Sequence, residues 1–137
     1  MNEKSLAQAA LQARETAYAP YSGFSVGAAL LTADGKIYAG CNVENAAYSP
    51  GNCAERTAFF KAISDGYREF QAIAVAGGKA GEPPSEFCPP CGVCRQVMME
   101  FCDPSRFRVI LVGKGGEIKS FFLQELLPFG FGPASLK

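Results

Sequence analysis

The sequence contains no histidine, carries no net charge and has no long apolar run. Without histidine, a transition-metal site must use thiolates or carboxylates, and a general base must be another residue type. Thirteen basic residues balance thirteen acidic ones, so the charge pattern favours neither nucleic acid nor an acidic membrane surface as a partner. No apolar stretch approaches the length of a membrane span, and the first five residues lack the apolar core of a signal peptide. We therefore expect a soluble cytoplasmic protein.

The chain is 137 residues long and contains six cysteines. This length suffices for a single hydrophobic core, and we expect residues 1–137 to form one domain. In a cytoplasmic chain, cysteines serve metal binding or catalysis more often than disulfides. The cysteines therefore indicate a metal-binding or catalytic site.

The apolar pattern predicts helices and strands that alternate along most of the chain. The predicted helices span residues 3–18, 53–64, 91–101 and 123–127, and the predicted strands 26–32, 37–43, 70–76, 107–112 and 117–121. Short glycine-containing turns make the first two strands and the last two strands antiparallel pairs, whereas the third and fourth strands should be parallel and joined through a helix. This order predicts an α/β fold, a three-layer α/β/α domain with a five-stranded mixed sheet.

Two stretches combine cysteine with the start of a predicted helix. The first is Asn52-Cys53-Ala54-Glu55-Arg56, and the second is Pro90-Cys91-Gly92-Val93-Cys94. A helix N-terminus offers unpaired N–H groups and the positive end of the helix dipole, which favour thiolate over thiol. Both crossovers run from strand through loop to helix, so both helix starts should lie at one edge of the sheet, where ligands of α/β proteins tend to bind.

Three thiolates at these positions suit a zinc site. Zn–S bonds of ~2.3 Å place tetrahedral ligands roughly 3.8 Å apart, and the i, i+3 spacing of Cys91 and Cys94 puts them side by side on a helix. Cys53 supplies the third ligand, and three protein ligands leave a position for water, as in catalytic sites. Glu55 follows Cys53 by only two positions, so the two side chains converge only if Cys53 caps the helix. Glu55 is then the candidate proton carrier.

Other interpretations of the cysteines stay open. Cys88 and Cys91 also form a C-x-x-C pair, which could be a redox dithiol or, with Cys88 as fourth ligand, a closed structural zinc site. We favour Cys91 with Cys94, because the two prolines between Cys88 and Cys91 keep Cys88 in extended chain. A closed site would also leave Glu55 without a role. Two further cysteines fall on apolar faces and are expected in the core: Cys41 and Cys102.

Cys53-Ala54-Glu55 together with Pro90-Cys91-x-x-Cys94 resembles the signature of the zinc-dependent deaminases, with cysteine where many members have histidine. Three further blocks resemble the small homotetrameric cytidine deaminases: Tyr21-Ser22-x-Phe24-x-Val26-Gly27-Ala28-Ala29-Leu30, Asn42-Val43-Glu44-Asn45-Ala46 and Leu126-Leu127-Pro128-x-x-Phe131. The match spans nearly the whole chain, and the second block narrows the substrate class to nucleosides. The proline-bearing stretch from Lys79 to Pro90 is longer than in the shortest family members.

The resemblance implies a zinc-dependent hydrolase that converts cytidine and 2'-deoxycytidine to uridine and 2'-deoxyuridine, with release of ammonia, in pyrimidine salvage. It assigns one zinc per chain to Cys53, Cys91 and Cys94, and the proton transfers to Glu55. It also implies a homotetramer in which Phe131 reaches a neighbouring subunit's site. The other implied substrate-binding residues are Phe24 packed on the base, Asn42 and Glu44 at the ribose hydroxyls, Val43, and Ala54 with its N–H at the pyrimidine O2.

Two other functions stay open. One is a nucleoside-analogue (drug) deaminase on the same fold, which the pair Asn42 and Glu44 argues against. The other is a non-enzymatic zinc-binding or redox module, which a test for a change in the ultraviolet absorbance of cytidine would separate from an enzyme.

Charge counting adds a prediction for Arg56. Zinc with three thiolates carries a formal charge of −1, which makes the metal a poorer Lewis acid. Two helix N-termini offset about half a charge each, and Arg56, three positions after Cys53, is the nearest full positive charge. We expect its guanidinium to donate hydrogen bonds to ligand sulfurs; the alternative is a surface salt bridge.

Overall fold

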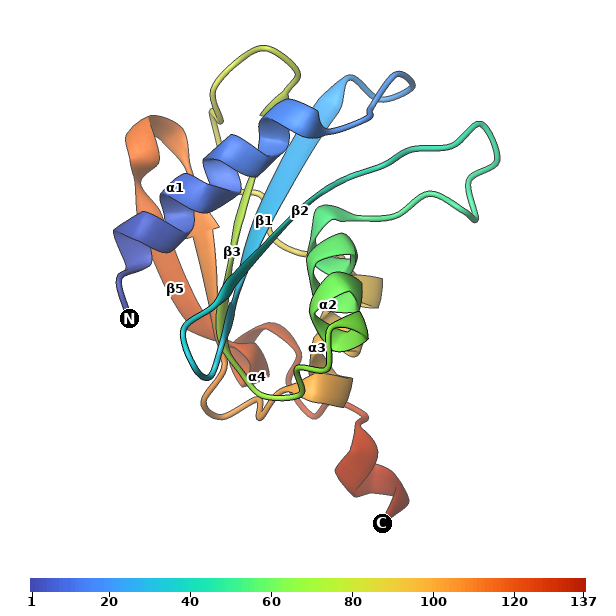
Figure 1. The fold of residues 1–137 in the computed structure, drawn as a ribbon, viewed down its shortest axis with the longest axis vertical. Helices are drawn as coiled ribbons and strands as arrows, with labels where there is room; N and C mark the ends of the chain where they lie inside the picture. The colour runs from blue at the N-terminus through green and yellow to red at the C-terminus, as the bar shows by residue number, and fades with distance from the viewer.

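In the computed structural model, which describes residues 1–137, five strands form one mixed sheet in the order β2-β1-β3-β4-β5 (Figure 1). The strands are β1 (Phe24–Thr32), β2 (Ile37–Cys41), β3 (Phe70–Lys79), β4 (Arg108–Val112) and β5 (Ile118–Phe122). Only β3 and β4 pair in parallel, and the other neighbours are antiparallel. The five-stranded mixed sheet, its two hairpins and its parallel pair are therefore confirmed.

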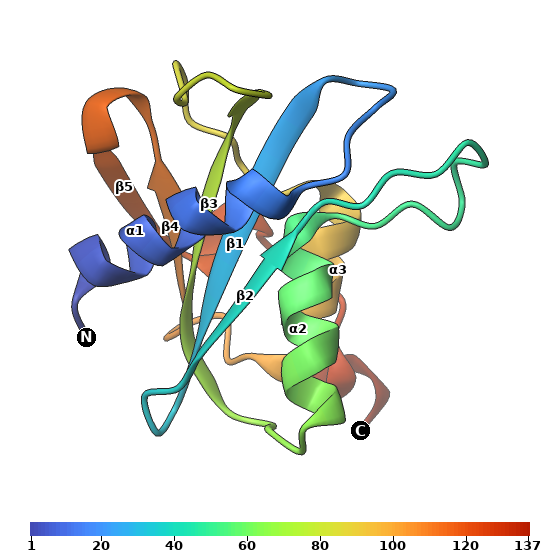
Figure 2. The same ribbon diagram turned by 45° about the horizontal axis from the view of Figure 1, so that its top comes forward.

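Helices cover both faces of the sheet. α1 (Glu3–Ala13) lies across one face, and α2 (Ala54–Ser64) and α3 (Gly92–Phe101) lie on the other (Figure 2). The short α4 (Leu123–Leu126) follows β5, and 3₁₀ turns occupy Arg14–Thr16, Lys114–Gly116 and Pro133–Leu136. These are the three predicted layers. None of the helices is both long and apolar enough to span a membrane.

The sheet separates two cores because successive residues of a strand face opposite sides. Val75 faces the α2 and α3 side, where Phe59 is fully buried among other large side chains. Ala74 faces α1, in a core built largely from alanines. A Cβ at Gly27 would lie 2.1 Å from Ala10 O, so the close approach of α1 to β1 requires glycine there.

Gly40 places the start of α2 against β2. A Cβ at Gly40 would lie 2.5 Å from Ala54 O and 2.6 Å from Ala58 N, which only glycine avoids. Ala54 is the first residue of α2. The missing side chain at Gly40 therefore sets how closely the helix N-terminus approaches the end of the strand.

Several element ends differ from the prediction. β2 stops at Cys41 instead of residue 43, because the Asn42 side chain takes over: its Oδ1 accepts from Val26 N at 2.8 Å and its Nδ2 donates to Phe24 O at 2.9 Å. β3 extends three residues beyond its predicted end, since Lys79 still pairs with Phe24. The first helix tightens into a 3₁₀ turn after residue 13 and ends at residue 16 rather than 18.

Candidate zinc centre and active-site pocket

Cys53 and Cys91 each occupy the N-cap position of a helix. The backbone is extended at Cys53 (φ −79°, ψ 156°) before α2 and at Cys91 (φ −69°, ψ 168°) before α3. The prediction that Cys53 caps its helix is confirmed. The prediction that Cys91 lies inside the next helix is wrong by one residue: Cys91 caps it, and its Sγ accepts from Cys94 N at 3.4 Å. Both thiols lie where helix N–H groups and the helix dipole favour the thiolate.

The sulfurs of Cys53, Cys91 and Cys94 form one cluster. Cys91 Sγ lies 3.8 Å from Cys53 Sγ and 3.5 Å from Cys94 Sγ, and all three atoms lie within 4.8 Å of one another. Thiolates that share a tetrahedral zinc have this spacing, about 3.8 Å. Cys88 lies outside the cluster, which contradicts the closed four-cysteine interpretation. Three protein ligands are the number typical of catalytic zinc sites.

The cluster carries negative charge next to Arg56. Arg56 Nη2 donates to Cys53 Sγ at 3.3 Å, and its buried Nε makes no hydrogen bond. Hydrogen bonding from Cys94, opposed by burial and assisted by Arg56, lowers the pKa of Cys53 to about 5, so Cys53 is a thiolate at neutral pH. The alternative of a surface salt bridge is contradicted, because the only ion pair of the chain joins Lys61 to Asp65.

Glu55 is the only buried acidic side chain, with 4% of its surface exposed. It lies in the first turn of α2, two residues after Cys53. Burial, partly opposed by a backbone hydrogen bond, raises the pKa of Glu55 to about 7. A carboxyl that titrates near neutral pH can accept a proton and return it, which is the property of a general acid–base residue.

A cavity of about 410 Å³ opens beside the sulfur cluster. Its volume is in the range of small-molecule sites. It is lined by Cys53, Glu55 and Cys91, and by five of the predicted substrate-binding residues: Phe24, Asn42, Val43, Glu44 and Ala54. It is also lined by residues that sequence reasoning did not assign to substrate, among them Ser22, Val26, Asn52, Cys88 and Pro89.

Glu44 is held by the turn that precedes β1. Its carboxylate accepts from Tyr21 N at 3.0 Å, from Ser22 N at 3.1 Å and from the Ser22 hydroxyl. These bonds, led by that of the Ser22 hydroxyl, lower the pKa of Glu44. Sequence reasoning missed Ser22 as a site residue. The available signal was its place in the Tyr21-Ser22-x-Phe24 block, since a hydroxyl there can bond a nearby carboxylate.

Three other predicted positions lie away from this pocket. Phe131 is exposed and does not line its own chain's pocket, and its carbonyl accepts from Gln96 Nε2 of α3 at 2.8 Å. Cys41 and Cys102, predicted in the core, are only half-buried. The Cys41 thiol contacts Thr16 O at 3.5 Å, and Cys102 packs against the edge of the α2 and α3 core.

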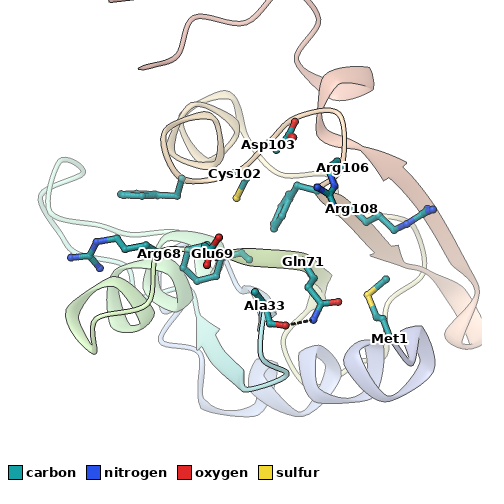
Figure 3. A pocket seen from close by; sticks show the side chains of 12 residues that line it. Met1, Ala33, Arg68, Glu69, Gln71, Cys102, Asp103, Arg106 and Arg108 are labelled. Carbon is teal, nitrogen blue, oxygen red and sulfur yellow. Dashed lines mark hydrogen bonds between the residues drawn. The ribbon is translucent and has the colours of Figure 1, made fainter. Parts of the chain in front are cut away.

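A second cavity, of about 550 Å³, is formed by the starts of β3 and β4 and the end of α3 (Figure 3). Arg68, Arg106, Arg108 and Cys102 line it. No group of three potential metal ligands other than the sulfur cluster occurs in the chain. The predicted chemistry therefore belongs to the smaller cavity.

Known proteins resemble this chain in sequence and in architecture. Residues 1–110 match the family model described as the cytidine and deoxycytidylate deaminase zinc-binding region. The chain is 52% identical to a cytidine deaminase of Sporosarcina psychrophila, covering 99% of this chain and 96% of that protein. It is 50% identical to the cytidine deaminase of Halalkalibacterium halodurans, over 96% of this chain and 95% of that protein.

Solved structures agree with these sequence matches. The crystal structure of cytidine deaminase from Burkholderia pseudomallei superimposes with a TM-score of 0.87 at 50% identity, over 96% of this chain and 100% of that one. That of the Mycobacterium tuberculosis enzyme gives 0.78 at 36% identity, over 96% and 98%. Family model, relatives and sulfur cluster agree: the chain belongs to the cytidine deaminase family of zinc-dependent hydrolases and binds one zinc ion.

Proposed function

We propose that the chain catalyses the hydrolytic deamination of cytidine and 2'-deoxycytidine to uridine and 2'-deoxyuridine, with release of ammonia, in pyrimidine salvage. One observation carries the proposal: a buried carboxyl with a pKa of about 7, Glu55, shares a cavity with the sulfur cluster and with Asn42 and Glu44. Glu55 and the metal site suit water addition to an electrophilic carbon. The amide and the carboxylate suit the hydroxyls of a sugar.

The reaction needs a nucleophile and successive proton transfers. Cys53, Cys91 and Cys94 would hold the zinc ion, which would supply Lewis-acid activation of a water molecule at neutral pH. Glu55 accepts a proton from the attacking water and passes it to N3 of the cytosine ring as the water oxygen bonds to C4. Glu55 then moves the second water proton to the amino group, which leaves as ammonia while C4 becomes a carbonyl. One carboxyl can serve each transfer, because a pKa near 7 disfavours neither of its forms.

The residues around the cavity orient the nucleoside. The hydrogen bonds of the Ser22 turn keep Glu44 ionised, so its carboxylate can accept from a ribose hydroxyl. Asn42 donates one amide N–H to Phe24 O, which leaves its second amide N–H for the sugar. Val43 lies between them along the wall. Ala54 begins α2, so its N–H has no partner within the helix and donates to the pyrimidine O2. Phe24 packs on the face of the base.

Arg56 balances the charge of the three thiolates. Its contact with Cys53 Sγ draws electron density away from the ligand sulfur, which keeps the metal a stronger Lewis acid. Against desolvation, hydrogen bonds to Cys53 and Cys94 raise the pKa of Arg56, so its positive charge is permanent. Arg56 is therefore a positioning and charge-balancing residue that does not touch the substrate.

The chain acts as one catalytic domain, residues 1–137, in a cytoplasmic homotetramer. Large aromatic side chains outside the core support assembly: Tyr48 is 93% exposed, and Phe129 and Phe131 are exposed as well. Phe129 also adopts a left-handed backbone with φ of 54°, which a bulky residue seldom keeps without compensating contacts. In the tetramer, Phe131 reaches the pocket of a neighbouring subunit. Six free cysteines suit a reducing compartment.

The test is direct. Zinc-loaded protein is mixed with cytidine or 2'-deoxycytidine, and the ultraviolet absorbance of the base is followed together with ammonia release. We expect uridine or 2'-deoxyuridine and ammonia in equal amounts, and no conversion by zinc-free protein. Conversion of modified analogues alone would instead indicate a nucleoside-analogue deaminase. Zinc binding without any hydrolysis would leave a non-enzymatic zinc module.

A further inference from the structure

We propose that Cys88 is a specificity-determining residue: with Phe24 it forms the partition that limits the size of a substituent on C5 of the pyrimidine ring. The proposal rests on the function proposed above, because that function sets how the base lies in the pocket. The substrates affected are pyrimidine nucleosides substituted at C5.

The partition separates two hollows. The nucleoside pocket of about 410 Å³ and a neighbouring hollow of about 530 Å³ are both lined by Phe24, Cys88 and Pro89. The rest of the second hollow is formed by the end of β3 and the loop that follows it. These three residues are therefore the shared wall, and a smaller side chain in the wall would join the two spaces.

Two glycines, Gly77 in β3 and Gly113 directly after β4, fix the position of Cys88. A Cβ at Gly77 of β3 would lie 2.8 Å from Cys88 Sγ and 3.0 Å from Phe24 Cε2. One residue earlier, the ring of Phe87 lies over Gly113, where a Cβ would be 2.9 Å from the ring. Two missing side chains thus let this part of the loop settle directly on the sheet. The thiol and the Phe24 ring both lie over Gly77 of β3, so the place of Cys88 in the wall is set by packing on the sheet.

Cys88 contributes shape to the pocket. It lies outside the cluster of metal ligands. Burial, with smaller contributions from Glu55 and Cys53, raises the pKa of Cys88 to about 11, so it is a neutral thiol at physiological pH. A neutral, half-buried thiol behaves as a small hydrophobic group. Its size is therefore the property that the pocket uses.

The orientation of the base assigns the C5 edge to this wall. In the proposed complex C4 lies at the sulfur cluster, and N1 carries the ribose toward Asn42 and Glu44. N3 faces Glu55 and O2 faces Ala54, both at the start of α2. The C5–C6 edge is then turned away from α2, toward the chain that leads into Cys91. Cys88 and Pro89 are the lining residues of that chain segment, and C5 is the ring atom next to C4, so a group on C5 meets them first.

The size of the effect follows from known discrimination by apolar pockets. One extra methylene changes kcat/KM by roughly 10–200-fold. Cys88→Ala opens the wall into the second hollow, so kcat/KM for 5-iodocytidine relative to cytidine should rise about tenfold or more. Cys88→Leu fills the same space and should lower that ratio. Electronic effects of iodine are the same in every variant, so changes in the ratio report the shape of the pocket.

The experiment measures this ratio, and the zinc content, for the holoenzyme, Cys88→Ala, Cys88→Leu and the control Cys102→Ala. Cys102 is another half-buried thiol, but it lines the arginine-lined cavity of about 550 Å³, away from the nucleoside pocket. Its replacement should leave the ratio at the wild-type value. Binding of 5-iodouridine relative to uridine is measured by calorimetry on the same proteins.

Opposite shifts of the kinetic ratio, kcat/KM for 5-iodocytidine relative to cytidine, in the Ala and Leu variants support the proposal. Either variant suffices if the other does not fold. A ratio that stays within about twofold of wild type in both variants overturns it. A wild-type enzyme inactive on cytidine would count against the proposed function, while the binding ratio would still decide the role of Cys88.

Discussion

Two cavities of this molecule, the nucleoside pocket and the arginine-lined cavity, lie at opposite ends of the strands and of α3. At one edge of the sheet α2 and α3 begin, and three sulfurs and Glu55 gather there. The other cavity lies where α3 ends and β3 and β4 start, and arginines line it (Figure 3). Helix N-termini favour thiolates and carboxylates, whereas helix C-termini favour cations. The arginine-lined cavity, although larger than the nucleoside pocket, accordingly lacks the group of metal ligands.

Two of the three arginines that line the second cavity, Arg68 and Arg108, are already engaged in holding the fold. Arg68 Nη1 donates to Ile63 O at 2.9 Å and to Tyr67 O at 2.8 Å, near the end of α2. Arg108 Nη1 donates to Ser120 Oγ at 3.3 Å. Arg56, at the other edge, has a ligand sulfur as its partner instead. Position relative to helix polarity, more than residue type or cavity size, separates the structural arginines from the one beside the metal site.

The largest expected difference between the edges concerns their carboxylates. Glu55→Gln preserves shape and removes the proton acceptor. We expect it to keep its fold and zinc while turnover of cytidine falls by about 10⁴-fold, the upper end for a general base, because the same carboxyl serves every proton transfer. Glu69→Gln, in the second cavity, is the matched control and should be as active as wild type. Steady-state kinetics with metal analysis decide the matter, and near-normal turnover in Glu55→Gln would exclude the assigned role.

The next difference concerns the cysteines. Cys94→Ser removes a ligand, so zinc affinity should fall by more than the roughly 100-fold that loss of an outer partner costs. Cys102→Ser, at the other edge, and Cys88→Ser, outside the cluster, should retain one zinc per chain by elemental analysis. Loss of metal from Cys88→Ser, with retention by Cys94→Ser, would show that the wrong ligands have been assigned.

The arginines should differ by a smaller factor. The positive charge of Arg56 lowers the pKa of Glu55, so Arg56→Gln should raise that pKa. The acidic limb of the pH–rate profile, where Glu55 must be ionised, then moves to higher pH, and turnover drops about 10–100-fold. Cys53→His in the same variant should recover part of the loss, because it restores a neutral metal site. Arg68→Gln is the control; an unchanged profile in Arg56→Gln would leave the charge argument without support.

The smallest expected effect comes from the C-terminal segment, which lies outside both cavities. Removal of residues 129–137 takes away Phe131 and should raise the Michaelis constant severalfold and loosen the oligomer, as seen by light scattering. Removal of residues 135–137 alone is the control and should do neither. A truncated protein that remains fully active as a monomer would contradict a pocket completed across a subunit interface.

Much of the reactive edge could be predicted from local sequence. Cysteine directly before an apolar helix, with Glu55 two residues later, is a short-range pattern, and helix capping then dictates where Cys53 points. The two hairpins and the parallel pair of strands followed from turn lengths and apolar runs for the same reason. The end of β2 was not predictable in this way, because it depends on the Asn42 side chain bonding Val26, sixteen residues away.

The features that sequence reasoning missed depend on contacts between distant segments. Cys88 is a wall of the pocket because it rests on Gly77, and Ser22 matters because it holds Glu44. Neither contact follows from a periodicity, and only Ser22 had a signal in the sequence, its place in the Tyr21-Ser22-x-Phe24 block. Cys102 shows the converse: it follows an apolar helix, as a core residue would, yet it lies at the rim of the second cavity and is only half-buried.

The difference between the two edges is tested most directly by X-ray absorption at the zinc edge of the loaded protein. Cys53, Cys91 and Cys94 should give three sulfur neighbours at about 2.3 Å and one oxygen or nitrogen neighbour at about 2.0 Å. The same spectrum should be obtained from Cys102→Ser. A shell of four sulfurs would contradict an open catalytic site, because Cys88 would then close the coordination and leave Glu55 without a water to activate.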